Sequence, residues 1–498
     1  MEATTAKTET AAGSGNGGGA QSWVDRLWSS VLERTGLGGG KAGAARSAGA
    51  AAAMAELPPL ERAKRLSEAL LSERGEASGA AVARELLAAS RELDPAQRTE
   101  VYRFLSGSFG PDAGRLRAAA EAWLAGPTPE NAARLADAAE PPRQELLRRM
   151  NMTAGGTAAL VGARREVLDL LREEPALKPL EADLKHLLAS WFNRGFLELR
   201  RIDWQTPAAV LEKLIQYEAV HEIQGWDDLR RRLAADRRCF GFFHPALPGE
   251  PLIFVEVALV EGLASAVQPL LAAPDGDRED AAQRRAARAD TAVFYSISNC
   301  QEGLRGISFG NFLIKQVVEE LKHELPRLER FATLSPVPGF RRWLEGRLAS
   351  PEAADLLHGH EWPALLAAAG YEGDDAAAAL AALLRADRWW EDADRAEALR
   401  PPLERLCTEY LTDPNGGRGP RDPVARFHLG NGARLERVNW LGNTAPRGMR
   451  EAFGLMVNYL YDLGSIEANH EAFVRNGAVA RSAQVEALLA PAAASRRG

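Results

Sequence analysis

The sequence predicts an α plus α/β fold, in which an all-helical domain comes first and a larger mixed-sheet α/β domain with helical insertions follows. Between residues 57 and 190, leucines recur at helical spacing and no strand-like run interrupts them. After residue 196, short runs of β-branched and aromatic residues alternate with helical patterns. The chain has 498 residues, of which 46% are hydrophobic, so it can bury more than one core.

The N-terminal part divides into a tail and a helical domain. Residues 1–55 are rich in Gly, Ala, Ser and Thr, which is typical of a disordered tail. Over residues 56–190, Pro58 and Pro59 begin the first predicted helix, and Asp94 before Pro95 is a suitable N-cap for another. This domain contains no motif that carries chemistry, so we expect it to serve packing or oligomerisation.

The predicted α/β domain spans residues 191–498. Its expected elements are strands at Phe196–Ile202, Cys239–His244, Leu252–Leu259 and Val293–Ser298, a helix at Pro207–Val220, and Ala- and Leu-rich helices over residues 345–412. A hairpin is expected from Arg426–Leu429 and Arg434–Trp440, because the Gly-Asn-Gly between them favours a tight turn. The last expected helix runs from Arg447 to Leu463.

The composition argues against several classes of function. A net charge of −7 and an isoelectric point near 5.8 argue against a general nucleic-acid-binding protein. No apolar run is long enough for a transmembrane helix and the first residues lack the plan of a signal peptide, so no membrane partner is expected. Cys239, Cys300 and Cys407 form no C-x-x-C pair, which fits a protein of the reducing cytoplasm. His358 and His360 have no third ligand nearby, so no metal site is expected.

The most informative stretch runs from Val293 to Phe340. Its pattern predicts a strand, a glycine-bearing loop, an amphipathic helix, a second strand and a loop that contains Ser335. The glycine-bearing loop consists of Arg305, Gly306, Ile307, Ser308, Phe309, Gly310 and Asn311. Such a loop at a helix N-terminus presents free backbone N–H groups, which suit a phosphate or pyrophosphate. An ordinary strand-to-helix turn is the alternative interpretation.

This order of elements is similar to the coenzyme A site of the acyl-CoA N-acyltransferase (GNAT) superfamily, whose loop is Gln/Arg-x-x-Gly-x-Gly/Ala. Arg305 and Gly310 match that loop, whereas Ser308 stands where its middle glycine is expected. From about residue 57 onward, the chain resembles the malonyl-CoA decarboxylase family. The segments that carry this resemblance are FFHPALPGEPLIFVEVALVEG (242–262), FYSIS (294–298), GISFGNFLIK (306–315), TLSPVPGF (333–340), RFHLGNGA (426–433) and GLMVNYLY (454–461).

The resemblance implies a GNAT-like catalytic domain behind a helical domain, assembled as a tetramer, with malonyl-CoA as its substrate. It places the catalytic serine at Ser335, the catalytic histidine at His428 and a tyrosine that lines the site at Tyr461. It also implies that loop 305–311 holds the coenzyme A pyrophosphate. Many relatives carry a glutamate where this chain has Ser308, so a role for that carboxylate does not transfer. Without the resemblance, the serine would be interpreted as a turn residue, the histidine as structural and the tyrosine as core.

The activity that the resemblance implies is conversion of malonyl-CoA to acetyl-CoA and CO2, which would control the malonyl-CoA level of fatty acid metabolism or serve malonate use. Loss of CO2 leaves an electron pair that the thioester carbonyl can accept as an enolate, so neither a metal nor an organic cofactor is expected. A serine and a histidine can stabilise the enolate oxygen and supply a proton, and the sequence leaves their division of roles open.

Two other functions stay open at this point. An acyl-CoA-dependent N-acyltransferase would need an amine acceptor, and a coenzyme A-binding regulatory subunit would have lost activity. A thioesterase is disfavoured, because no Gly-x-Ser-x-Gly motif surrounds Ser335.

Overall fold

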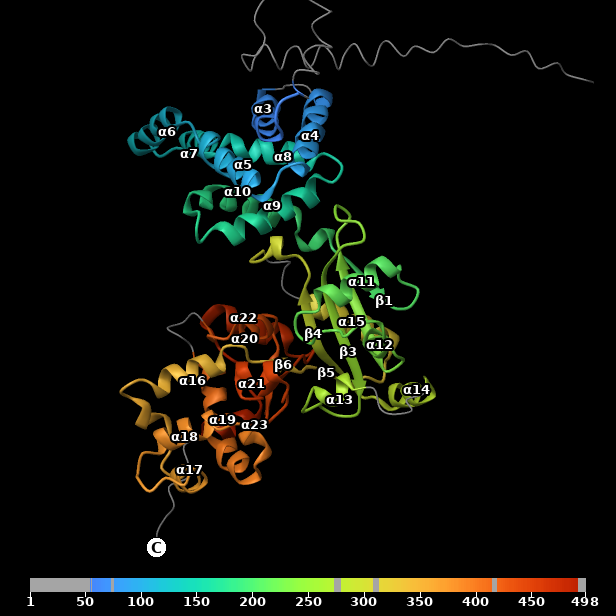
Figure 1. Ribbon diagram of the computed structural model, residues 1–498, viewed down its shortest axis with the longest axis vertical. Coiled ribbons are helices and arrows are strands. Elements are labelled where there is room, and N and C mark those ends of the chain that lie inside the picture. The colour runs from blue at the N-terminus through green and yellow to red at the C-terminus, as the bar shows by residue number, and fades with distance from the viewer. Residues whose placement is uncertain are drawn as a thin grey trace, which may run out of the picture. The chain divides into compact units, whose positions relative to one another are not determined.

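The computed structural model describes residues 54, 56–72, 76–272, 279–307, 313–413 and 419–490, and the predicted tail lies outside them apart from residue 54. The chain divides into two compact units (Figure 1). The helical unit comprises Met1–Phe192 together with Glu302–Ile307, and the sheet unit comprises Asn193–Gln301 and Ser308–Gly498. A helical region followed by a mixed-sheet region with helices confirms the predicted fold class.

The described residues of the helical unit form helices and connecting turns without any strand. The α-helices are α3 (Pro59–Ser72), α4 (Glu76–Arg91), α5 (Pro95–Ser108), α6 (Ala113–Ala125), α7 (Pro129–Ala139), α8 (Pro142–Asn151), α9 (Gly156–Leu170) and α10 (Lys178–Trp191). Asp94 caps α5 as predicted, because its side chain accepts a hydrogen bond from the Gln97 backbone N–H. The Gln97 side chain in turn accepts from the Asp94 N–H, which completes a capping box.

The sheet unit is built on an eight-stranded mixed sheet with the order β1-β2-β3-β4-β5-β8-β6, in which β7 pairs with β8. The strands are β1 (Glu198–Ile202), β2 (Arg237–Phe243), β3 (Pro251–Val260), β4 (Thr291–Asn299), β5 (Arg330–Thr333), β6 (Ser335–Pro336), β7 (Arg434–Asn439) and β8 (Met456–Leu460). Strands β1 to β4 pair antiparallel, whereas β4 and β5 are parallel and are connected through α15 (Leu313–Glu324). The four strands predicted between residues 196 and 298 are therefore confirmed.

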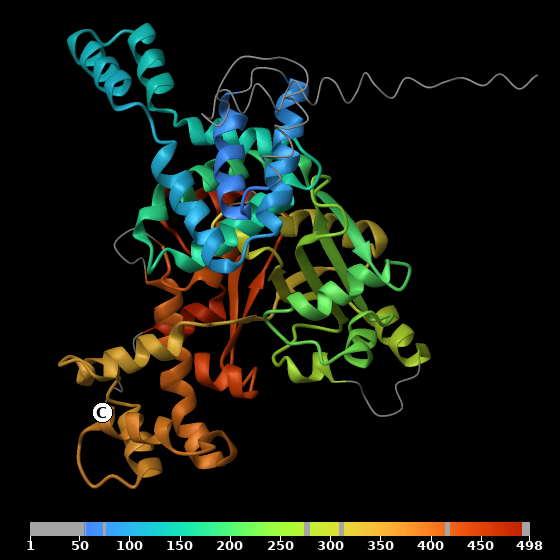
Figure 2. The ribbon, with the colours of Figure 1, turned by 45° about the horizontal axis from the view of Figure 1, so that its top comes forward.

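Helices accompany the sheet and form a long insertion. The helices among the first strands are α11 (Ala208–Tyr217), α12 (Trp226–Arg232), α13 (Gln268–Leu271) and α14 (Glu279–Arg288). The insertion consists of α16 (Phe340–Leu348), α17 (Trp362–Ala369), α18 (Ala376–Arg385) and α19 (Ala393–Thr412). The last two helices are α22 (Ile466–Asn476) and α23 (Ala483–Leu489). Figures 1 and 2 show the insertion, in amber and orange, beside the red C-terminal elements and away from the green strands β1–β3. Among the described residues, no helix has the length and apolar character needed to cross a membrane.

The predicted hairpin is wrong, because residues 426–429 belong to helix α20 (Pro423–Gly430). The Asp422 side chain accepts hydrogen bonds from two backbone N–H groups in the first turn of α20. A proline at the first helical position also fits the start of a helix. The helix ends before Gly432, whose φ of 82° suits glycine. Strand β7 consequently pairs with β8 rather than with residues 426–429.

The last predicted helix is wrong in its second half. Helix α21 (Pro446–Ala452) ends where Phe453 and Gly454 adopt positive φ angles of 53° and 80°. The chain then continues as strand β8, which pairs with β5, β6 and β7. Tyr461 therefore follows a strand and does not lie on a helix face.

Candidate active site

The three side chains predicted to form the centre of the site lie together in the sheet unit. Ser335 Oγ lies 3.1 Å from His428 Nε2, and His428 Nδ1 lies 2.8 Å from the hydroxyl oxygen of Tyr461. All three residues are buried, with exposed fractions of 5%, 3% and 2%. The structure thus joins residues that are 93 and 33 positions apart in the sequence into one hydrogen-bonded chain.

Neighbouring elements of the sheet fix each of these side chains. Ser335 lies in the short strand β6, where it pairs with Val457 of β8, and not in the loop that the sequence predicts. Tyr461 directly follows β8, and its backbone N–H donates to the Phe331 carbonyl of β5 at 2.8 Å. Because β8 lies between β5 and β6 in the sheet, it brings the serine and the tyrosine to the same region.

His428 reaches the site from the last turn of α20, and an aromatic ring supports its imidazole. The ring of Tyr459 stacks on the imidazole with 4.7 Å between ring centroids and 25° between planes. The Ala433 backbone N–H donates to the His428 carbonyl at 3.1 Å, which closes the end of the helix onto the start of β7. The imidazole is therefore held by packing on its face and by hydrogen bonds at both nitrogens.

Burial keeps the hydrogen-bonded chain uncharged near neutral pH. It lowers the pKa of His428 from 6.5 to about 3, because the charged imidazolium would lose its hydration. Burial also raises the pKa of the Tyr461 hydroxyl well above its usual value of 10. A neutral imidazole has one N–H donor and one acceptor nitrogen, so His428 can pass a proton from one neighbour to the other.

Ser335 and His428 line a mainly apolar cavity of about 280 Å³. Its apolar walls come from strands β2, β3, β4 and β6, from the start of α15, from α20, and from the connections between α11 and α12 and between β5 and β6. The apolar residues are Val220, Phe242, Ile253, Val255, Phe294, Ile297, Leu313, Ile314, Leu334, Pro336, Pro423, Val424 and Phe427. A cavity with few, convergent polar groups is typical of a small-molecule site.

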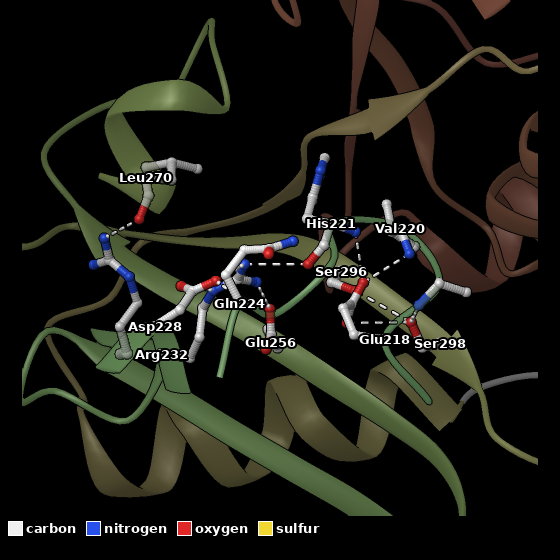
Figure 3. A network of polar contacts seen from close by, with 12 residues as sticks. Glu218, Val220, His221, Gln224, Asp228, Arg232, Glu256, Leu270, Ser296 and Ser298 are labelled. Carbon is white, nitrogen blue, oxygen red and sulfur yellow. Dashed lines mark hydrogen bonds and ion pairs between the residues drawn. The ribbon is translucent and has the colours of Figure 1, made fainter. Parts of the chain in front are cut away.

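A buried carboxylate behind the cavity was missed by the sequence analysis. Glu218 follows α11, and both of its oxygens lie 2.8 Å from the hydroxyl of Ser296, which donates to them (Figure 3). The backbone N–H groups of Val220 and His221 donate to the same carboxylate at 2.7 Å each. Because Val220 and Ser296 both line the cavity, Glu218 ties two parts of its wall together. No local sequence pattern marks this carboxylate.

The same region contains a buried ion pair. Arg232 donates to Glu256 at 2.7 Å and to the His221 carbonyl at 3.1 Å (Figure 3). Burial raises the pKa of Glu256 to about 7, although Arg232 opposes that shift. His221 Nε2 has no hydrogen-bond partner in the described part of the chain, and burial lowers the pKa of His221 to about 4.

The predicted phosphate loop is described only in part. Ser308, Phe309, Gly310 and Asn311 lie outside the described residues. Arg305, Gly306 and Ile307 belong to the helical unit, where Arg164 donates to the carbonyls of Gly303 at 2.6 Å and Arg305 at 2.9 Å. The guanidinium of Arg305 is 3.3 Å from Glu302 on the surface.

The structure corrects the expectation that His358 and His360 have no third ligand nearby. The possible ligand atoms of these two histidines and of Glu361 lie within 4.8 Å of one another. However, Arg405 donates to both carboxylate oxygens of Glu361, at 2.9 and 2.8 Å. A cation in this place would therefore compete with a buried, bidentate ion pair.

Comparison with known proteins gives a consistent result over both units. A model of the malonyl-CoA decarboxylase C-terminal domain matches residues 195–498, and a model of the N-terminal domain of the same family matches residues 109–192. A goose protein (Anser anser anser) named mitochondrial malonyl-CoA decarboxylase is 36% identical over 405 residues, which cover 78% of this chain and 79% of the relative.

Two crystal structures of malonyl-CoA decarboxylases are also similar to this chain. The protein from Rhodopseudomonas palustris is 51% identical, with a TM-score of 0.76 over 86% of this chain and 99% of that structure. The protein from Agrobacterium vitis is 48% identical, with a TM-score of 0.76 over 86% of this chain and all of that structure.

Proposed function

We propose that this chain, which belongs to the malonyl-CoA decarboxylase family, is a carboxy-lyase that releases CO2 from malonyl-CoA at Ser335 and His428. The observation that carries the assignment to these residues is the buried chain Ser335–His428–Tyr461 at the wall of an apolar cavity. Hydrogen-bond donors in a water-poor site act strongly on developing charge.

The reaction draws on the substrate's own thioester. When the bond between the α-carbon and the carboxylate breaks, its electron pair moves onto the α-carbon and the thioester oxygen, and CO2 leaves. The resulting enolate needs a donor at its oxygen and one proton at its carbon. Neither step requires a metal or an organic cofactor, because the thioester carbonyl is the electron sink.

The uncharged state of His428 supports one division of the two roles. An imidazole with a pKa of about 3 is not an imidazolium at neutral pH, so it acts as a neutral N–H donor. Ser335, which lies next to His428 at the cavity, donates its hydroxyl proton to the thioester oxygen or the α-carbon. The Nε2 proton of His428 then moves to Ser335 Oγ as the Tyr461 hydroxyl proton moves to Nδ1, and solvent reprotonates Tyr461. These transfers leave the imidazole as its Nδ1–H tautomer, so the ring exchanges back to the Nε2–H tautomer before the next turnover. One proton is consumed for each CO2 released.

Three further parts of the proposal have other support. Binding of the coenzyme A pyrophosphate by loop 305–311 is supported by the match of Arg305 and Gly310 to the superfamily's loop. Assembly as a tetramer is supported by the family resemblance alone. A cytoplasmic location is supported by three free, buried cysteines, whereas the goose relative is named mitochondrial.

The test is release of CO2 and acetyl-CoA from malonyl-CoA by the purified chain without any amine. We expect Ser335→Ala and His428→Asn each to lower kcat by about a hundredfold or more, which is the usual contribution of a positioned acid–base group. Matched controls are Ser350→Ala, at the end of α16, and His186→Asn, on the exposed surface of α10; both should leave the rate unchanged.

Two outcomes would favour the alternatives. Release of free coenzyme A only when an amine is present would indicate an N-acyltransferase. Coenzyme A binding without turnover under any condition would indicate a regulatory subunit. If the native chain decarboxylates and neither substitution matters, the reaction stands but the two residues are wrongly assigned.

A further inference from the structure

Thr333, the last residue of β5, lies at the inner end of the Tyr461–His428–Ser335 chain. The Ser335 hydroxyl donates to Thr333 Oγ1 at 2.8 Å. The Tyr459 backbone N–H donates to the same Oγ1 at 3.2 Å, so two donors converge on this oxygen. Thr333 is fully buried and does not line the cavity, so it does not meet the substrate there.

The number of protons on these side chains gives the direction of each hydrogen bond from Tyr461 to Thr333. A serine hydroxyl has one proton, and here that proton points to Thr333. The 3.1 Å contact with His428 therefore requires a proton on Nε2, which donates to Ser335 Oγ. A neutral imidazole then has no proton on Nδ1, so the Tyr461 hydroxyl donates to Nδ1.

We propose that Thr333 is a positioning residue that sets this direction, from Tyr461 through His428 to Ser335, and so selects the Nε2–H tautomer of His428. The proposal rests on the proposed function and names a further residue on which the reaction depends. Thr333 Oγ1 has two acceptor lone pairs, and the Tyr459 backbone N–H and the Ser335 hydroxyl donate to them.

The direction of these hydrogen bonds decides which chemical role Ser335 can have. In a hydrolase, the serine donates to the histidine and becomes a nucleophile. Here Ser335 accepts a hydrogen bond from His428 and donates its own proton to Thr333 instead of to His428. When a thioester oxygen enters the cavity, it can replace Thr333 as the acceptor of the serine proton, and no other hydrogen bond in the chain has to reverse. Ser335 is thus prepared as a donor to the enolate.

The experiment compares Thr333→Val, which keeps the shape but removes the hydroxyl, with Thr333→Ser, which keeps the hydroxyl. Both are made in the full chain. We expect the valine variant to lose about ten- to hundredfold in kcat with little change in KM, and the serine variant to keep most of the native kcat. Equal losses in both variants, together with a lower unfolding midpoint in each, would overturn the proposal in favour of simple packing.

The second readout is the tautomer of His428, measured by 15N NMR of the imidazole nitrogens and assigned by the signal that His428→Asn removes. We expect Nε2 to carry the proton in the native chain and Nδ1 to carry it in Thr333→Val, because the freed serine proton then turns to the histidine. A proton on Nδ1 in the native chain, or an unchanged tautomer in the valine variant, would overturn the proposal. This readout needs no turnover, so it decides about Thr333 even if the chain fails to decarboxylate malonyl-CoA.

Discussion

At the scale of single residues, the hydroxyl of Tyr461 has a task that a phenylalanine cannot perform. It bonds to His428 Nδ1 at 2.8 Å, and both groups are buried. We expect Tyr461→Phe to lower the free energy of unfolding by about 1–3 kcal/mol, because a buried nitrogen loses its partner. The proton relay would also be cut, so kcat should fall. Chemical denaturation and steady-state kinetics measure the two effects.

The matched control is Tyr371→Phe, at a tyrosine that is 44% exposed. It removes a tyrosine hydroxyl from the surface and should change neither the free energy of unfolding nor kcat. If Tyr461→Phe were as stable and as active as the native chain, the tyrosine would be a wall residue and not part of the relay.

The three central residues could be predicted from the sequence, whereas most of the residues that position them could not. Ser335, His428 and Tyr461 could be named because short family segments surround them. Thr333 could have been suspected, since positions i and i+2 of an extended chain share a face. Glu218 could not, because its partner Ser296 is 78 positions away and no local pattern links them.

At the scale of elements, segment Glu302–Ile307 depends on a close approach to helix α9. A Cβ atom at Gly303 would lie 2.0 Å from the Val161 carbonyl oxygen, so alanine there must push the segment away. We expect Gly303→Ala to lower the free energy of unfolding by about 1–3 kcal/mol, as overpacking usually does. If loop 305–311 binds coenzyme A, the KM for malonyl-CoA should rise as well.

The matched control for this substitution is Gly162→Ala on α9 itself, where a Cβ would meet nothing within 4 Å. It should be neutral or slightly stabilising, because alanine favours a helix. Thermal unfolding and KM measurements on both variants test the contact. Equal behaviour of the two would mean that the segment does not pack on α9 in solution.

Elements were predicted well where one periodicity dominates and poorly where tertiary pairing decides. Strands β1 to β4 and the helical domain carry long, consistent patterns. The short apolar run of helix α20 resembles a strand, although Asp422 and the proline after it form a helix start. The sequence does not show where helix α21 ends before strand β8, because the break at Phe453 requires a positive φ in a residue other than glycine.

At the scale of the whole molecule, the order of a helical part before a mixed-sheet part could be read from the change of periodicity. The packing of residues 302–307 with the helical unit could not be predicted in this way, because these residues follow soon after strand β4 in the sequence. Their place is decided by Arg164 of α9, whose guanidinium binds two of their carbonyls. Long-range contacts of this kind leave no local signal.

Buried titratable groups make the stability of the molecule depend on pH in two opposing ways. His428 and His221 have pKa values of about 3 and about 4 in the folded chain, against 6.5 when unfolded. As the pH falls below 6.5, the unfolded state binds protons that the folded state does not, so these groups lower stability in acid. Asp422 and Glu256, with pKa values raised to about 6 and about 7, have the opposite effect between pH 4 and 7.

A comparison of variants isolates the contribution of His428 from these opposing effects. Between pH 7.5 and pH 5, the native chain should lose about 2 kcal/mol of unfolding free energy through His428, at about 1.4 kcal/mol for each pKa unit. His428→Asn cannot lose this amount, so the stability difference between the native chain and the variant should move by about 2 kcal/mol in favour of the variant on acidification. Urea unfolding at both pH values measures it, with His186→Asn as the control. A difference that stays constant with pH would mean that His428 titrates normally, and the neutral donor on which the proposed reaction depends would not exist.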